Sequence, residues 1–196
     1  MRRIYFATSN KNKFNEASRI LEKYGYELVL FSFEKKELQS TDLGEIALQS
    51  ALIAYTYVNA SVVVEDSGLF IKALNGFPGP FSSYVYKTIG VRGVLKLMEG
   101  VTDRSAYFEA AVAIVMPPFE RVFKGSVYGR IADSPRGTGG FGFDPIFIPE
   151  NEDKTFAEMS VEEKNKYSHR ARAFEKLGIW LKSIELREKL MQKELI

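Results

Sequence analysis

Polar residues with several hydrogen-bond donors follow a short apolar run in the stretch "ATSNKNKFNEA" at residues 7–17. A strand-like segment ends there and a helical pattern begins, so these residues lie at a helix N-terminus. The first-turn N–H groups have no partner within the helix, and the helix dipole adds roughly half a positive charge, so an anion binds well there. Thr8, Ser9 and Asn10 add side-chain donors, and Lys13 adds a charge that can reach a phosphate. The stretch equally allows Ser9 or Asn10 to cap the helix, with the lysines on the surface.

Two carboxylates are candidates for holding a cation. Magnesium binds one or two carboxylates together with phosphate oxygens and water. Asp66 ends the apolar strand "SVVVEDS" at residues 61–67, where an α/β sheet usually presents its ligand groups. Glu37 lies in the charged run "FEKKELQ", for which a solvated loop is the default interpretation.

The glycine-rich segment "GTGGFG" at residues 137–142 matches the dinucleotide-binding pattern GxGxxG, but that function is rejected. The pattern requires a helix directly after it, and Pro145 and Pro149 follow instead. These glycines are better suited to a tight turn or to the close approach of a planar ligand. Phe141 and Phe143 could stack on a base, although core packing is the commoner role of Phe.

The segment "KNKYSHRARAF" at residues 164–174 places a histidine and an arginine at a second helix start. Ser168 is a candidate N-cap, which puts His169 and Arg170 in the first turn. Taken alone, a single histidine is more often structural than catalytic, and Arg170 next to Arg172 is more often a surface residue. This segment gains weight only beside the other motifs.

The composition of the chain excludes several classes of protein. Its 196 residues, 45% hydrophobic and 27% charged, are typical of a globular protein, and a net charge of +2 does not indicate binding to nucleic acid through bulk charge. The absence of Cys excludes disulfides and a Cys nucleophile, and the single His excludes a multi-His zinc site. No signal peptide and no apolar run of roughly 18 residues are visible. We therefore expect a cytoplasmic protein that binds neither membranes nor nucleic acid.

The elements that position these residues alternate along the chain. Strands are predicted at 3–8, 26–31 and 61–67, with a helix between the first two that Gly25 ends, and a helix after Asp42, whose N-cap signature includes Glu45. An irregular segment around 75–84 precedes a helix over 87–98. Residues 106–116 and 120–131 form two antiparallel strands. Ser160 and Glu163 form a capping box before a helical tail. The order predicts one α/β domain, residues 1–196, with a mixed sheet in two lobes.

Five motifs occur in an order that resembles one family. The pattern T/S-x-N-x-x-K-x-x-E is present as Thr8, Asn10, Lys13 and Glu16. It is followed by "EDSGL" at 65–69, "GFPG" at 76–79, "FGFDPIF" at 141–147 and "SHR" at 168–170. This set, spread over about residues 4–182, resembles the inosine triphosphate pyrophosphatases, which hydrolyse aberrant purine nucleoside triphosphates such as ITP, dITP and XTP.

The resemblance implies an elongated α/β fold around a long mixed sheet, a substrate cleft between two lobes, and a homodimer. It implies magnesium-dependent attack of water at the α-phosphorus, which yields a monophosphate and pyrophosphate. Asp66 would accept the proton and, with Glu37, hold Mg²⁺. His169 and Arg170 are candidates for reading the 6-oxo group of the base. The substrate-binding residues implied are Thr8, Ser9, Asn10, Lys11, Asn12, Lys13, Ser67, Phe141, Gly142, Phe143, Asp144, Lys164, His169 and Arg170.

Two departures and two alternatives remain open. Phe143 stands where many relatives have Tyr, and Tyr84 where many have Arg, which affects the hydroxyl at the first position and the dimer surface at the second. One alternative is a nucleotide- or RNA-binding module without chemistry, against which Asp66 argues because a carboxylate repels phosphate unless a metal intervenes. The other is a pyrophosphatase for modified pyrimidine triphosphates. On an ideal helix Lys11 points about 200° away from Lys13, so the two lysines should behave differently.

Overall fold

The computed structural model describes residues 2–32 and 38–194. Its strands are β1 (Arg2–Ala7), β2 (Tyr26–Phe31), β3 (Val62–Ile71), β4 (Pro78–Gly79), β5 (Ser105–Met116), β6 (Phe119–Ile131) and β7 (Phe147–Pro149). Its α-helices are α1 (Lys11–Leu21), α2 (Leu43–Val58), α3 (Ser82–Thr88), α4 (Gly90–Leu97), α5 (Val161–Lys164) and α6 (His169–Glu194). Short 3-10 helices occupy Glu22–Tyr24, Lys72–Leu74, Asp144–Ile146 and Phe156–Glu158.

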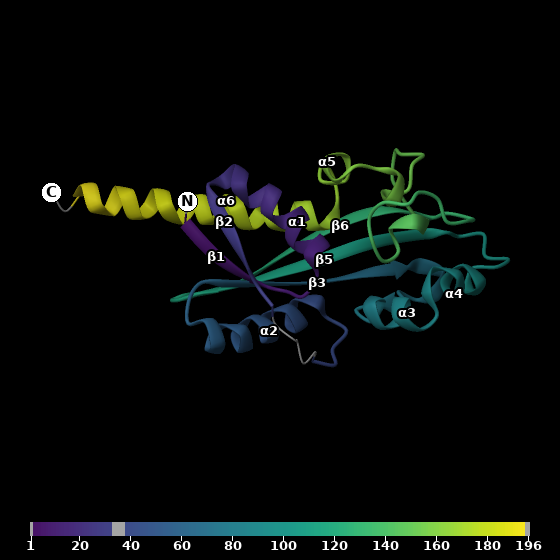
Figure 1. Cartoon of the computed structure of the whole chain (residues 1–196), viewed down its shortest axis with the longest axis horizontal. Coiled ribbons are helices and arrows are strands. Elements are labelled where there is room, and N and C mark those ends of the chain that lie inside the picture. The colour runs from purple at the N-terminus through teal and green to yellow at the C-terminus, as the bar shows by residue number, and fades with distance from the viewer. Residues whose placement is uncertain (1, 33–37, 195–196) are drawn as a thin grey trace.

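The described strands form one seven-stranded sheet in the order β2-β1-β3-β5-β6-β7, with β4 paired to β3. β1 runs parallel to both β2 and β3, whereas β3, β5, β6 and β7 pair antiparallel. The predicted mixed α/β sheet is therefore confirmed. The long strands β3, β5 and β6 run along the long axis of the elongated molecule, and the C-terminal part of α6 extends beyond them (Figure 1).

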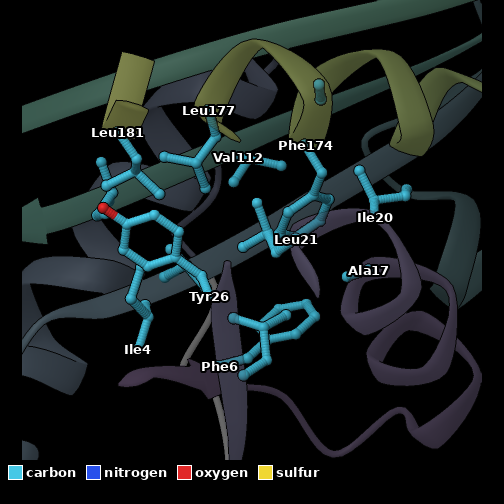
Figure 2. Packing of buried hydrophobic residues seen from close by; sticks show 14 of the residues in the cluster. Ile4, Phe6, Ala17, Ile20, Leu21, Tyr26, Val112, Phe174, Leu177 and Leu181 are labelled. Atoms are coloured by element: carbon cyan, nitrogen blue, oxygen red, sulfur yellow. The ribbon is translucent and has the colours of Figure 1, made fainter. Parts of the chain in front are cut away.

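Helices cover both faces of the sheet. α1 and α6 lie on one face and α2 on the other. α3 and α4 lie towards the end of the molecule that is remote from the C-terminus of α6 (Figure 1). Beneath α1 and α6, apolar side chains of both helices pack on the sheet. Phe174 and Leu177 of α6, for example, lie in one cluster with Phe6 of β1 and Val112 of β5 (Figure 2). On the other face α2 packs its small residues, such as Ala47 and Ala51, on Val62 and Val64 of β3.

The predicted helix boundaries are largely confirmed. The Asp42 carboxylate accepts hydrogen bonds from the backbone N–H groups of Gly44 and Glu45, as expected of the N-cap of α2. The Ser160–Glu163 capping box is present at α5, and Gly25 takes the left-handed conformation (φ 78°) after the first helix.

Two expectations about local structure are wrong. Asp66 does not end a strand, because β3 pairs with β5 without interruption from Val62 to Ile71 and so carries Asp66 at its middle. The segment expected to be irregular is helical from Ser82, and α3 is separated by Ile89 from α4, which begins at Gly90 (φ 62°). The Ser82 hydroxyl donates to Gly79 O and accepts from Leu69 N, so a tertiary contact sets this helix start, which local propensity does not indicate.

Candidate active site

A gap in strand pairing along one edge of β3 creates the site. On that edge β1 pairs only with Val62 and Val63, and β4 pairs only with Leu69 and Phe70. Within the described residues, positions 64–68 have no strand partner there. A cavity of about 970 Å³ opens at this edge, a volume suited to a nucleotide-sized ligand.

The cavity gathers residues from every motif that the sequence singled out except "GFPG". The predicted site residues on its wall are Thr8, Ser9, Asn10, Lys11, Lys13, Asp66, Ser67, Phe141, Gly142, Phe143, Asp144, Lys164, His169 and Arg170. Asn12 is absent from this wall, and Glu37 lies outside the described residues. The sequence did not predict the wall supplied by α3, which includes Tyr84, Tyr86 and Lys87.

Capping does occur in the opening stretch. The Asn10 side chain accepts hydrogen bonds from the backbone N–H groups of Asn12 and Lys13, so Asn10 is the N-cap of α1. The Thr8 hydroxyl accepts from Asn10 N. Lys11, the first residue of α1, lines the same cavity as Lys13, so the expected difference between the two lysines stays a prediction. Phosphate binding by this stretch stays a prediction.

Three cations of the cavity wall belong to a buried ion network. Glu65 Oε2 lies 2.8 Å from Lys13 Nζ, and Glu65 Oε1 lies 3.0 Å from Arg170 Nη2. The other terminal nitrogen of Arg170 donates to Glu16 Oε2 at 2.5 Å. Lys164 Nζ then links Glu16 Oε1 at 2.9 Å.

Asp144 ends this network, because its Oδ2 lies 2.7 Å from Lys164 Nζ and also accepts a hydrogen bond from Phe141 N. The order in space is Lys13, Glu65, Arg170, Glu16, Lys164, Asp144, so cation and anion alternate throughout. Arg170 is only 1% exposed, which overturns the default expectation of a surface arginine. Such burial is tolerable because each charge has an opposite neighbour.

The titration of these groups follows from burial and from their partners. Burial raises the pKa of Glu65, but the charges of Arg170 and Lys13 outweigh it, and the pKa lies well below its ordinary value. Burial likewise opposes ionisation of Glu16, whose pKa is nevertheless lowered by Arg170 and Lys164. Burial raises the pKa of Asp144 despite Lys164. At neutral pH Glu65 and Glu16 are therefore carboxylates that hold the cations in place.

Neighbouring residues of β3 face different layers of the molecule. Side chains alternate along a strand. Val63 packs in the cluster under α1 and α6, and Glu65 faces the same side, where it meets Lys13 and Arg170. Asp66 therefore faces the α2 side with Val62 and Val64. Both carboxylates line one cavity because it wraps around the edge of β3.

Aromatic rings surround the buried charges. The Phe141 ring centroid lies 4.8 Å from Lys164 Nζ and 5.3 Å from Arg170 Cζ. Phe143 is 3% exposed, packs in the hydrophobic core and meets Tyr86 edge-on. Of the two candidates for base stacking, Phe141 is thus the more accessible.

His169 stacks on Phe108 at 4.8 Å with an interplanar angle of 12°. Its pKa lies well below the ordinary value, because burial and the charges of Arg170 and Lys164 disfavour the imidazolium. Its Nδ1 is buried and has no hydrogen-bond partner within the described part of the chain. A neutral imidazole keeps one donor and one acceptor, so His169 can bond to a ligand in either sense. The predicted N-cap Ser168 accepts from Ala171 N.

Glycine is required at two places around the cavity. A Cβ on Gly68 would lie 2.2 Å from Gly79 O, so only glycine lets the "EDSGL" strand approach the "GFPG" turn. A Cβ on Gly140 would lie 2.3 Å from Asp144 Oδ2. The glycine-rich segment is tied to the carboxylate that receives Lys164 by the hydrogen bond from Phe141 N to Asp144 Oδ2.

Two carboxylates of the ion network were not among the predicted site residues. Glu16 and Glu65 both stand in the quoted motifs, yet neither was given a role. The available signal was their spacing: Glu16 lies one helical turn after Lys13, and Glu65 precedes Asp66 in an otherwise apolar strand. A carboxylate in such a strand is expected to be paired.

The sequence model of the Ham1 family matches residues 4–180. The chain belongs to the Ham1 family. It is 50% identical over 179 residues to a protein of Hyperthermus butylicus named dITP/XTP pyrophosphatase, covering 91% of this chain and 94% of that protein. A protein of the same name from Saccharolobus solfataricus is 50% identical over 186 residues, with 95% and 97% covered. The predicted family resemblance is thereby confirmed.

Solved structures agree with this assignment. A Ham1 protein from Coxiella burnetii superposes with a TM-score of 0.83 at 33% identity, covering 93% of this chain and all (100%) of that one. A structure from Mycobacterium abscessus titled nucleoside-triphosphatase or dITP/XTP pyrophosphatase gives a TM-score of 0.70 at 35% identity, with 89% and 98% covered. In the described residues no helix, α6 included, is both long and apolar enough to span a membrane.

Proposed function

We propose that this protein hydrolyses aberrant purine nucleoside triphosphates (ITP, dITP and XTP) to the monophosphate and pyrophosphate and thereby removes them from the nucleotide pool. The observation that carries the proposal is the cavity at the edge of β3, which is lined by residues of four of the five family motifs. The names of the relatives support the choice of substrate.

The charges around the cavity suit a triphosphate that arrives with a cation. Five basic side chains line it (Lys11, Lys13, Lys87, Lys164 and Arg170), but three of them are already paired with carboxylates. A triphosphate carries about four negative charges near neutral pH, so the protein's own cations balance only part of them. A bound metal would supply the rest.

The donor set fits magnesium. Magnesium needs only one or two carboxylates when substrate phosphates and water complete its shell. Asp66 lines the cavity, on the opposite face of β3 from the cation network, and Glu37 is the second predicted ligand. When bound, the metal would polarise the phosphate and lower the pKa of a coordinated water.

The chain's own residues would position the reacting groups. Lys13 and the N-terminus of α1 hold phosphate oxygens, and Ser67 lies beside them on β3. Asp66, as the carboxylate on the far side of the strand edge, accepts the proton from the attacking water. The water attacks the α-phosphorus, the α–β bond breaks, and pyrophosphate leaves.

Selection of the base rests on His169 and Arg170. Inosine and xanthosine carry a 6-oxo group where adenine has an amino group. Hydrogen-bond donors aimed at that oxygen would face the amino group of adenine, which is itself a donor, and would stay unpaired. Sites of this kind discriminate between two substrates by about 10⁴-fold. The neutral His169 would donate to the oxygen, and Phe141, whose ring lies beside Arg170, would stack on the base.

The test is a substrate panel with purified protein and magnesium. ITP should release pyrophosphate much faster than ATP or GTP does. Equal rates with ATP would refute the base selectivity, and orthophosphate as the first product would refute the bond assignment. Preference for 5-methyl-UTP or dTTP would favour a pyrimidine enzyme instead, and binding without turnover would favour a nucleotide-binding module. The homodimer and the cytoplasmic location stay predictions, the first to be measured by light scattering.

A further inference from the structure

Glu65 lies between the two ends of the proposed substrate site. Its side chain has no exposed surface (0%), and its two oxygens have different partners. Oε2 lies 2.8 Å from Lys13 Nζ, on the helix whose N-terminus is the predicted phosphate site. Oε1 lies 3.0 Å from Arg170 Nη2, beside the Phe141 ring.

This geometry links two cations that would serve different parts of one ligand. Lys13 belongs to the phosphate end of the proposed site and Arg170 to the base end. Because Glu65 is paired with both cations, a movement of either one changes the electrostatic environment of its carboxylate. A phosphate that draws Lys13 towards itself removes one of the two charges that compensate Glu65. The compensation by Arg170 must then increase, because an unpaired buried carboxylate is costly.

Arg170 has few other ways to respond. Its second terminal nitrogen is bound to Glu16, and Nη2 also donates to Ser67 Oγ at 3.3 Å. A planar guanidinium fixed at both terminal nitrogens can change its orientation only if its carboxylates move with it. The position of Glu65 therefore sets the position of Arg170.

We propose that Glu65 is a positioning residue that couples phosphate binding at Lys13 to recognition of the base at Arg170. Glu65 does not touch the substrate; it acts through the two cations. The proposal rests on the proposed function for the identity of the ligands, but the coupling itself is a property of binding.

Calorimetric titrations of Glu65→Gln and of the wild-type protein test this coupling in the presence of EDTA, where turnover does not interfere. The probes are pyrophosphate, ITP and ATP. Gln keeps the shape of the side chain but removes the negative charge that competes with phosphate for Lys13. Pyrophosphate should therefore bind about tenfold more tightly to this variant. Arg170 loses one of its two carboxylates, so the preference for ITP over ATP should narrow by about tenfold.

Glu109→Gln is the matched control. Glu109 lies on the neighbouring strand β5, bonds Ser126 and approaches Lys124, and lies outside the cavity wall. Its substitution should change neither affinity. Glu65→Asp is the second variant: it keeps the charge but is too short to reach both cations, so it should narrow the ITP preference without tightening pyrophosphate binding.

Several results would overturn the coupling. These are an unchanged ITP preference in folded Glu65→Gln, or weaker binding of all three probes together with a lowered Tm. Loss of folding in both Glu65 variants would likewise overturn the coupling, since the role of Glu65 would then be to stabilise the folded core. A wild-type protein that binds these probes but does not hydrolyse ITP with magnesium would contradict the proposed function and leave the binding comparison intact.

Discussion

Two walls of the cavity treat positive charge in opposite ways. On the wall built by α1, α5 and α6, Lys13, Lys164 and Arg170 are buried or nearly so and alternate with three carboxylates. On the wall built by α3, Lys87 and the two tyrosines that precede it, Tyr84 and Tyr86, are exposed, and within the described residues no ion pair of Lys87 occurs.

The difference shows that one wall holds side chains in fixed positions, whereas the other supplies an exposed positive charge. The buried ion network contributes no net charge, since three cations face three anions, but its geometry is fixed by short contacts. The α3 wall, with Tyr84 69% exposed, contributes a charge and exposed surface. A site that must select a base needs the first kind of wall, whereas attraction of a polyanion needs only the second. Four predictions test this contrast.

The largest effect is expected at Asp66, which lies on the strand between the two walls. Asp66→Asn removes the proposed proton acceptor and metal ligand while keeping the size of the side chain. The rate of pyrophosphate release from ITP should fall by about 10²–10⁴-fold. A pure binding protein would instead keep or gain affinity for the nucleotide, so calorimetry on the same variant separates the two functions.

The second prediction compares stability at the two walls. Arg170→Met leaves Glu16 and Glu65 buried without their shared cation, and breaking such a network costs about 3–5 kcal/mol of unfolding free energy. Lys87→Ala is the control on the exposed wall and should change the unfolding free energy by no more than about 0.5 kcal/mol. Urea denaturation measures both, and equal losses would abolish the distinction between the walls.

The third prediction concerns the two lysines of α1. If Lys13 contacts a phosphate, Lys13→Ala removes a charge-assisted bond worth roughly 1.5–3 kcal/mol, and kcat/KM should fall by about 10- to 150-fold. Lys11 lines the cavity but is exposed, so Lys11→Ala should cost about fivefold at most. A loss mainly in kcat indicates a contact that strengthens in the transition state, and a loss in KM indicates simple substrate binding. Near-normal activity of both variants would contradict phosphate binding by this stretch.

The smallest effect is expected in the pH dependence of stability. His169 is the single histidine of the chain, and its pKa in the folded protein lies well below the ordinary value of 6.5. Below pH 6.5 the unfolded chain therefore binds a proton that the folded protein does not, so stability is full above pH 6.5 and falls as the pH drops through it. The slope approaches about 1.4 kcal/mol per pH unit before the carboxylates titrate. His169→Gln should remove this slope between pH 6.5 and 5, and a slope retained in the variant would mean that another group is responsible.

The sequence predicted most of the fold because its signals were local. Alternation and apolar runs located β1, β2 and the β5–β6 hairpin, and side-chain caps at Asp42 and Ser160 located helix starts. It failed where a long-range contact decided the outcome. Ser67 and Gly68 resemble a turn, yet β3 continues through them because β5 pairs along its whole length. Helix α3 begins at Ser82 because that hydroxyl bonds Gly79 and Leu69.

The candidate site divides in the same way. The sequence by itself determined which residue types were available. The order of its motifs identified the family, because that order can be read from the sequence without knowledge of the fold. Only the tertiary structure decided which charges meet. Arg170 lies 105 residues from Glu65 and 154 from Glu16 along the chain, so no spacing rule joins them. The packing of α1 and α6 on one face of the sheet beside β3 brings them together, and burial then forces each cation to take a carboxylate as its neighbour.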